Sequence, residues 1–181
     1  MKKLIPLFSI VALPLVALNA HANSGSINFV GEITDSTCTV VVDGQAADAT
    51  VTLPTVSKDL LAADGDVAGK THFNIVMTGC TLGGSPADTQ VSTYFEAGPS
   101  VDVNSGFLIN SGSATNVAFR LTDGTSNNVI KAGRESQSAD NSYATVAEGG
   151  ASLPYAVEYV ASGKSTAGTV LSSITYNIMY K

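Results

Sequence analysis

The last fourteen residues of this 181-residue chain, Gly168 to Lys181, constrain its fold more than any other stretch. From position 170 onward, apolar or aromatic residues fall mainly at even positions and polar residues at odd positions. This is the period-two pattern of a β-strand with one buried face, and it covers about eleven residues, roughly twice an ordinary strand. A strand that carries core-facing residues to the end of the chain needs a neighbour on each side, and we expect one neighbour to come from another molecule. The predicted core-facing residues are Val170, Ile174, Tyr176, Ile178 and Tyr180.

The first 22 residues have the organisation of a secretory signal peptide. Two lysines near the start precede a mainly apolar run over residues 4–18, and residues 20–22 form a small-x-small cleavage site. A membrane anchor would need a longer apolar run and a stop-transfer flank. We therefore expect residues 1–22 to be removed, which leaves 159 of the 181 residues, enough for one domain with a hydrophobic core.

The composition of the remaining chain is that of an acidic, exported all-β protein. Loss of the two lysines takes the net charge from −6 to −8, and no basic run is present, which argues against nucleic acid as a partner. Low charge, 17 glycines and abundant Val, Thr and Ser favour strands over helices.

Two cysteines, Cys38 and Cys80, predict one disulfide, because an even count in an exported chain usually indicates pairing. The loop that it closes is worth roughly 4 kcal/mol of stability in the chain-entropy model. A metal site would need further Cys or His ligands at short spacing, and the sequence has none there.

A second alternating stretch lies near the predicted mature N-terminus. Its face consists of Ile27, Phe29, Gly31 and Ile33. The glycine lets another backbone or a bulky neighbour approach closely. An ordinary first strand with a bulge explains this pattern equally well, so the residues alone leave both interpretations open.

Between these two ends, turn signals separate eight to ten short apolar runs, which predicts a β-sandwich without a further domain boundary. We expect a helical turn within residues 57–69 and polar surface loops at residues 83–86 and 133–142. The predicted strand over residues 71–80 places Cys80 beside the strand that holds Cys38. The predicted internal strands are residues 38–42, 49–53, 71–80, 91–97, 107–110, 117–122, 129–131, 143–146 and 153–161.

The sequence contains no recognisable catalytic, cofactor or metal motif. His72 is the one histidine left after processing, and a single strand histidine is usually solvated. Residues 163–165 end like a phosphate loop but lack its first glycine, and Asp64 with Asp66 lacks the rest of a calcium loop. We expect a protein that is not an enzyme and that needs no cofactor.

Taken together, the export signal, the early disulfide and the alternating strands at both ends resemble the structural subunits of chaperone–usher, type-1-like fimbriae. Gly168 is fourteenth from the end and Tyr180 is next to last, which is the spacing of the C-terminal motif of that family. The matching segments are residues 29–31 with Cys38, residues 78–80, residues 153–168 and the last fourteen residues.

The resemblance implies an incomplete immunoglobulin-like β-sandwich that lacks its last strand. Residues 23–33 are then an N-terminal donor-strand extension and residues 34–181 the pilin domain. In that family a periplasmic chaperone first fills a groove beside the C-terminal strand, and the N-terminal extension of the next subunit replaces it by donor-strand exchange. The donor residues implied here are Ile27, Phe29, Gly31 and Ile33. The accepting residues are Gly168, Val170, Ile174, Tyr176, Ile178, Tyr180 and Lys181.

The expected partners are therefore identical or related pilin subunits in an open homopolymer, a periplasmic chaperone that holds the terminal carboxylate of Lys181, and an outer-membrane usher. We expect export through the periplasm to a fimbria on the bacterial surface, with this chain as the major shaft subunit. Because only residues 23–26 precede the apolar donor pattern, a minor or adaptor subunit stays open. A secreted carbohydrate-binding sandwich also stays open, although the absence of Trp weakens it, as does a secreted hydrolase, for which no paired carboxylates are apparent.

Overall fold

The computed structural model describes residues 28–31, 33, 37–81 and 89–181. The predicted signal peptide, the first donor residue Ile27 and the predicted loop at residues 83–86 lie outside these ranges. The chain divides into two compact units, residues 1–33 and residues 34–181.

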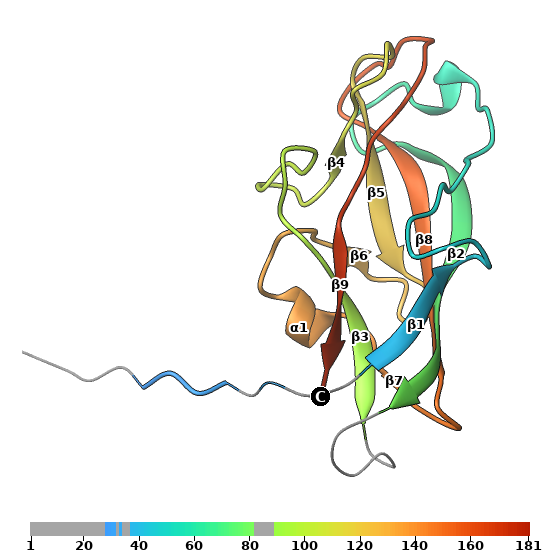
Figure 1. Ribbon diagram of the computed structural model, residues 1–181. Helices are drawn as coiled ribbons and strands as arrows, with labels where there is room; N and C mark the ends of the chain where they lie inside the picture. The colour runs from blue at the N-terminus through green and yellow to red at the C-terminus, as the bar shows by residue number, and fades with distance from the viewer. Residues whose placement is uncertain (1–27, 32, 34–36, 82–88) are drawn as a thin grey trace, which may run out of the picture. The chain divides into compact units, whose positions relative to one another are not determined.

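The second unit contains two antiparallel sheets (Figure 1). The larger, six-stranded sheet has the order β1-β2-β8-β5-β4, with β6 also paired to β5, and the smaller sheet has the order β7-β3-β9. A 3₁₀ turn, η1, and a short helix, α1, lie in the connections. The bounds are β1 Thr37–Val42, η1 Lys58–Leu60, β2 Val67–Thr81, β3 Gln90–Phe95, β4 Leu108–Ile109, β5 Val117–Asp123, β6 Val129–Ile130, α1 Gln137–Asp140, β7 Ala144–Thr145, β8 Ala151–Ala161 and β9 Tyr176–Tyr180.

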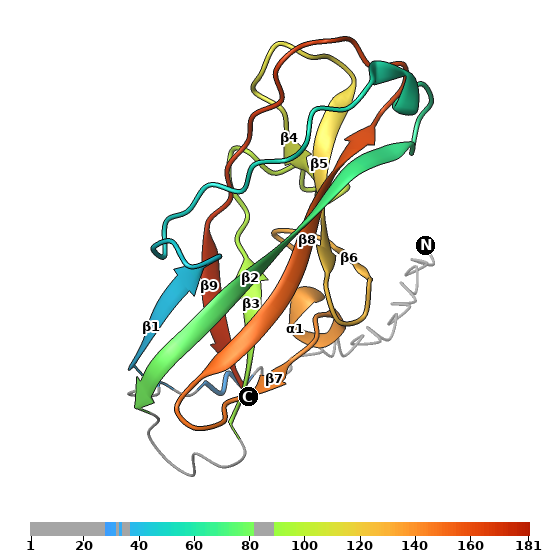
Figure 2. The ribbon, with the colours of Figure 1, turned by 90° about the vertical axis from the view of Figure 1, so that its right-hand side faces the viewer.

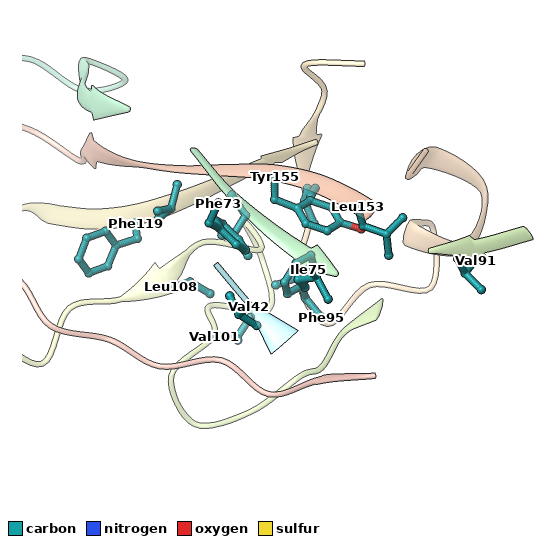
Figure 3. Packing of buried hydrophobic residues seen from close by; sticks show 14 of the residues in the cluster. Val42, Phe73, Ile75, Val91, Phe95, Val101, Leu108, Phe119, Leu153 and Tyr155 are labelled. Carbon is teal, nitrogen blue, oxygen red and sulfur yellow. The ribbon is translucent and has the colours of Figure 1, made fainter. Parts of the chain in front are cut away.

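The core lies between the two sheets because the long strands alternate in the way that a sandwich requires. In β2, Phe73, Ile75 and Met77 are buried while the residues between them are exposed or half-buried. Tyr155 of β8 packs edge-on against Phe95 of β3, with 5.2 Å between the ring centroids. Figure 3 shows these side chains converging from both sheets. The fold prediction of an all-β sandwich is therefore confirmed.

Most of the strands predicted between the two ends are present within a few residues of their expected positions. The β2 and β8 strands are longer than expected because they pair with each other over Val67–Met77 and Ala151–Val160. The predicted disulfide is present and joins Cys38 in β1 to Cys80 in β2, whose Cα atoms are 4.1 Å apart. The helical turn predicted within residues 57–69 is the 3₁₀ turn over Lys58–Leu60.

The final strand is shorter than the alternation predicts. Only Tyr176–Tyr180 form β9, whereas residues 170–175 have no strand assignment. The alternation of burial nevertheless continues through this stretch, with half-buried even positions and exposed odd positions. The sequence pattern therefore predicted the face of each side chain correctly, and the strand length was wrong because a strand also needs a hydrogen-bonded neighbour.

The N-terminal strand is not formed. Residues 28–31 and 33 have no strand assignment, and Phe29 and Ile33 are 91% and 100% exposed. Period-two alternation shows which side chains can be buried together, and it cannot supply the partner that buries them.

Two further predictions were wrong. Residues 49–53 form no strand, because β1 pairs with β2, and a turn with positive φ at Asp43 and Gly44 leads the chain away from β1. The polar stretch at residues 133–142 is not only a surface loop. It contains α1, and its Gln137 and Asn141 are buried.

Candidate strand-addition site

The β9 strand lies at the edge of the smaller sheet. It pairs with β3 from Val91 opposite Tyr180 to Phe95 opposite Tyr176, and no strand among the described residues pairs with its other side. We call this other side the open edge. An unpaired strand edge presents a row of backbone hydrogen-bonding groups and is a template for pairing with another chain.

The hydrogen bonds to β3 show which backbone groups the open edge presents. Lys181 and Gln90 exchange two backbone hydrogen bonds of 2.8 and 2.9 Å, and the N–H of Glu96 donates to the carbonyl of Thr175 at 2.9 Å. The N–H and C=O of successive strand residues point to alternate sides, so the backbone groups of the odd residues of β9 form hydrogen bonds with β3. The backbone groups of Tyr176, Ile178 and Tyr180 therefore face the open edge.

The side chains of the same even residues face the core. They are half-buried, they pack against the main hydrophobic cluster, and their odd neighbours Thr175 and Asn177 are exposed. The open edge therefore combines free backbone groups with an incompletely covered apolar row. The residues in this row are Val170, Ile174, Tyr176, Ile178 and Tyr180.

The opposite edge of the small sheet is closed by side chains. Beyond the two-residue strand β7, the N–H of Thr93 donates to the phenol oxygen of Tyr155 at 3.2 Å, and the N–H of Phe95 donates to Oε1 of Gln137 at 3.0 Å. The amides of Gln137 and Asn141 donate to the carbonyls of Phe95 and Thr93 at 2.9 and 3.0 Å. The contrast shows that the described part of the chain caps one edge of the sheet with its own side chains and leaves the other edge uncapped.

A second unpaired stretch lies across from β9 and the residues before it. We call residues 47–56 the facing segment. Its Val51 and Leu53 are half-buried against the main cluster. Among the described residues, the one hydrogen-bond partner for the backbone of residues 49–56 is the side chain of Gln45, which bonds both the N–H and the C=O of Thr50. Burial alternates over residues 51–54, as it does along a strand.

The facing segment runs antiparallel to the last residues of the chain. At one end, the hydroxyl of Tyr176 donates to the carbonyl of Ala47 at 2.9 Å. At the other end, Val56 and Val170 pack on the same small cluster of buried residues. Figures 1 and 2 show the two stretches along the same flank of the domain. No backbone hydrogen bond joins them in these fully described stretches.

The β1 strand also borders this region, because it is the edge of the larger sheet. The Sγ of Cys38 lies 4.0 Å from the hydroxyl of Tyr180. The disulfide therefore attaches the start of β1 to β2 next to the last residues of β9.

The structure separates the predicted accepting residues into two groups. The five apolar and aromatic residues lie in one row, as described above. Gly168 instead packs closely against residues 113–114. A Cβ added to it would lie 2.5 Å from the backbone nitrogen of Ala114. Lys181 continues the pairing with Gln90, and its Nζ lies 5.2 Å from the centroid of the Tyr143 ring.

Of the predicted donor residues, Phe29, Gly31 and Ile33 are described, and all three are exposed. Sequence reasoning missed the facing segment as part of the site. The available signal was the apolar alternation of Val51 and Leu53, which we interpreted as an ordinary internal strand. Chain order alone does not show that this stretch lies opposite the C-terminus.

The described residues contain no group of three or more His, Cys, Asp or Glu side chains that could hold a metal ion. His72 is exposed, and the Oδ2 of Asp66 accepts hydrogen bonds from the N–H groups of Ala62 and Ala63, which makes it part of a turn. Within the same ranges, no helix is long and apolar enough to cross a membrane.

A buried carboxyl group, Asp123, stabilises the fold and lies outside the candidate site. Asp123 is 2% exposed. Burial by itself raises its pKa, but hydrogen bonds from the backbone N–H groups of Ser126, Ser142 and Thr125 outweigh burial and lower the pKa below the usual value. This carboxylate ties the turn after β5 to the segment before β7.

Within the described residues, the sandwich has an open edge on the outer side of β9. Comparison with known families identifies the class of protein, because the model of the type-1 fimbrial protein A family (FimA) matches residues 53–181. The chain belongs to this family, and the predicted resemblance is confirmed.

Individual relatives extend the match to almost the whole chain. The major fimbrial subunit SMF-1 of Stenotrophomonas maltophilia is 43% identical over 170 residues, which cover 90% of this chain and 96% of the relative. The F17 fimbrial protein of Escherichia coli is 34% identical over 162 residues, covering 88% and 89%.

Solved structures show the same fold. A chaperone–usher pilus structure aligns with a TM-score of 0.62 at 23% identity, covering 91% of this chain and all of that one. The P pilus rod subunit PapA aligns with a TM-score of 0.58 at 22% identity, covering 80% and 99%.

Proposed function

We propose that this protein is a structural shaft subunit of an adhesive fimbria on the bacterial surface, that it has no catalytic role, and that it polymerises by strand addition. Its family membership and its similarity to a major fimbrial subunit support the structural role. The observation that carries the mechanism is the open edge of β9, where the backbone groups and core-facing side chains of the same residues both lack a covering strand.

The strand that covers this edge comes from residues 23–33 of a second copy. Ile27, Phe29 and Ile33 supply apolar side chains at every second position, and Gly31 supplies a position without a side chain. Such an added strand gains affinity from its backbone ladder and specificity from alternate side chains, which is the general logic of β-augmentation. Burial of each large apolar side chain contributes about 1.5–3 kcal/mol.

Geometry supports a strand that lies between β9 and the facing segment. Because these two stretches are antiparallel, a strand between them runs antiparallel to one and parallel to the other. Val51 and Leu53 then flank it on one side, while Ile174, Tyr176 and Ile178 flank it on the other. This placement covers both rows of half-buried side chains at once.

Donation and acceptance use different parts of the chain, so each subunit accepts from one neighbour and donates to another. Such a heterologous contact does not close on itself and generates a filament. The exposed Phe29, Val30 and Ile33 are the kind of apolar surface that a soluble monomer rarely leaves uncovered.

An open edge is an aggregation hazard before assembly, which favours a dedicated periplasmic chaperone that occupies it during export. We include in the proposal that the terminal carboxylate of Lys181 is held by basic residues of that chaperone, and that an outer-membrane usher arranges the exchange. The signal peptide over residues 1–22 starts this route.

Two complementary variants test the proposal. Deletion of residues 23–33 removes donation, and Ile178→Asp places a charge in the accepting row. Each variant alone is expected to stay unpolymerised, whereas an equimolar mixture is expected to form dimers that stop at two subunits, as measured by native gel electrophoresis and light scattering. Ser173→Asp, at an exposed odd position, is the matched control and is expected to polymerise normally. Polymers longer than dimers in the mixture would refute the proposed division of roles.

A further inference from the structure

One hydrogen bond joins the two stretches that border the open edge. It runs from the hydroxyl of Tyr176 to the carbonyl of Ala47, over 2.9 Å, between residues 129 positions apart. Among the described residues, no other hydrogen bond links the facing segment with residues 168–181. The spacing between these stretches therefore depends on one side chain.

Tyr176 can resist movement of these stretches in both directions. Its ring is half-buried and packs against the main hydrophobic cluster, so the rigid phenol reaches from β9 to the facing segment along the core side. Two apolar rows without a strand between them gain free energy by closing onto each other. The ring opposes this closure, and the hydroxyl opposes the reverse movement by holding the Ala47 carbonyl.

The facing segment needs such support because it has little of its own. The chain that leads from β1 into the facing segment is held by a turn, in which the N–H of Val42 donates to the carbonyl of Ala46. Residues 51–56 then make no backbone hydrogen bond. Without the bond at Ala47, the hydrogen bonds between Thr50 and Gln45 would remain, but they lie within the same loop. The position of Val51 and Leu53 against the core would then depend on apolar contacts, which have no preferred direction.

We propose that Tyr176 is a positioning residue for strand capture, whose hydroxyl holds the facing segment at the distance that an incoming strand requires. This inference rests on the proposed function. A binding site that is already in its bound geometry loses less conformational entropy on association. The hydroxyl therefore acts before the strand arrives, and its main effect is on the rate of association.

The matched pair of variants is Tyr176→Phe and Tyr143→Phe. Both keep the ring and remove one phenol hydroxyl that donates to a backbone carbonyl over 2.9 Å. The hydroxyl of Tyr143 bonds to Ser138, whereas that of Tyr176 bonds to the facing segment. Tyr176→Leu, which also loses the ring, is the second variant at the proposed position.

The test uses the full chain with its disulfide intact, diluted from denaturant, and a fluorescent synthetic peptide with the sequence of residues 23–36. Stopped-flow anisotropy gives the association rate, and competition with unlabelled peptide gives the dissociation rate. We expect Tyr176→Phe to slow association about three- to tenfold, the range that corresponds to one net hydrogen bond, with dissociation nearly unchanged. Tyr176→Leu is expected to be slower still, and Tyr143→Phe to match the wild type.

Hydrogen exchange provides a readout that does not depend on strand capture. The amides of Val42 and Thr50 donate hydrogen bonds on either side of Ala47, to the carbonyl of Ala46 and to Oε1 of Gln45. They are expected to exchange faster in Tyr176→Phe than in Tyr143→Phe or the wild type. Unchanged exchange at these amides, or unchanged or faster association of the Tyr176 variants, overturns the positioning role. A wild-type chain that does not bind the peptide at all instead overturns the proposed function, while the exchange result still decides whether Tyr176 holds the facing segment.

Discussion

The phenol oxygen of Tyr155, in β8 of the larger sheet, accepts a hydrogen bond of 3.2 Å from the backbone N–H of Thr93, in β3 of the smaller sheet. This bond crosses the core between the two sheets. It is needed because β7 pairs only with Gln90 and Val91, so the N–H of Thr93 has no strand partner on that side. The same burial raises the pKa of the Tyr155 hydroxyl.

Replacement of Tyr155 by Phe is expected to lower the free energy of unfolding by about 1–3 kcal/mol, because the buried N–H of Thr93 is left without a partner. Urea unfolding followed by circular dichroism measures this change. Tyr143→Phe, whose half-buried ring lies outside the two core clusters, is the control and is expected to change stability by less than about 1 kcal/mol. Equal stability of the two variants would show that the inter-sheet bond contributes little.

Replacement of both Cys38 and Cys80 by Ser is expected to cost about 2–5 kcal/mol of stability and to reduce strand capture. The bridge attaches the start of β1 to β2 next to Tyr180, so its loss frees a strand that borders the open edge. Urea unfolding measures the first effect, and binding of the peptide with the sequence of residues 23–36 measures the second. A double-serine variant that is weaker in stability but binds the peptide normally would show that β1 is not needed at the site.

The carboxylate of Asp123 predicts a specific pH dependence. Its pKa is lower in the folded protein than the value of about 3.8 expected when unfolded, so its contribution is complete above that value and is lost as the pH falls through the folded pKa. Asp123→Asn is expected to lower stability at pH 7 by about 1–3 kcal/mol and to make the loss of stability below about pH 4 less steep. Urea unfolding at a series of pH values measures both, and Asp64→Asn, at an exposed position, is the control.

Tyr180→Ser is expected to weaken capture by the periplasmic chaperone, because it removes a large side chain from the accepting row next to the chain end. Co-purification of the subunit with the chaperone from periplasmic extracts measures this effect. Leu171→Ser removes a comparable apolar side chain from an odd position that is 60% exposed, and it is expected to leave capture unchanged. Equal yields of complex for Tyr180→Ser and the wild type would contradict the assignment of this row.

Much of the site can be predicted from the order of residues. The alternation from Val170 to Tyr180 correctly indicated which side chains face the core, since period two depends only on local geometry. The disulfide also followed from the sequence, because two cysteines in an exported chain allow one pairing. The buried roles of Gln137 and Asn141 could not be predicted, because polar residues in a stretch without periodicity give no sign that they cap a strand edge.

The amino-acid sequence by itself determined the face of each side chain, the pairing of the cysteines and the resemblance to fimbrial subunits, since all of these depend on residue identity and spacing. Only the tertiary structure decided that β9 has a partner on one side alone and that residues 47–56 lie opposite it. The physical reason is that a strand is completed by hydrogen bonds between stretches far apart in the chain. Local periodicity contains no information about which stretch, or which molecule, supplies them.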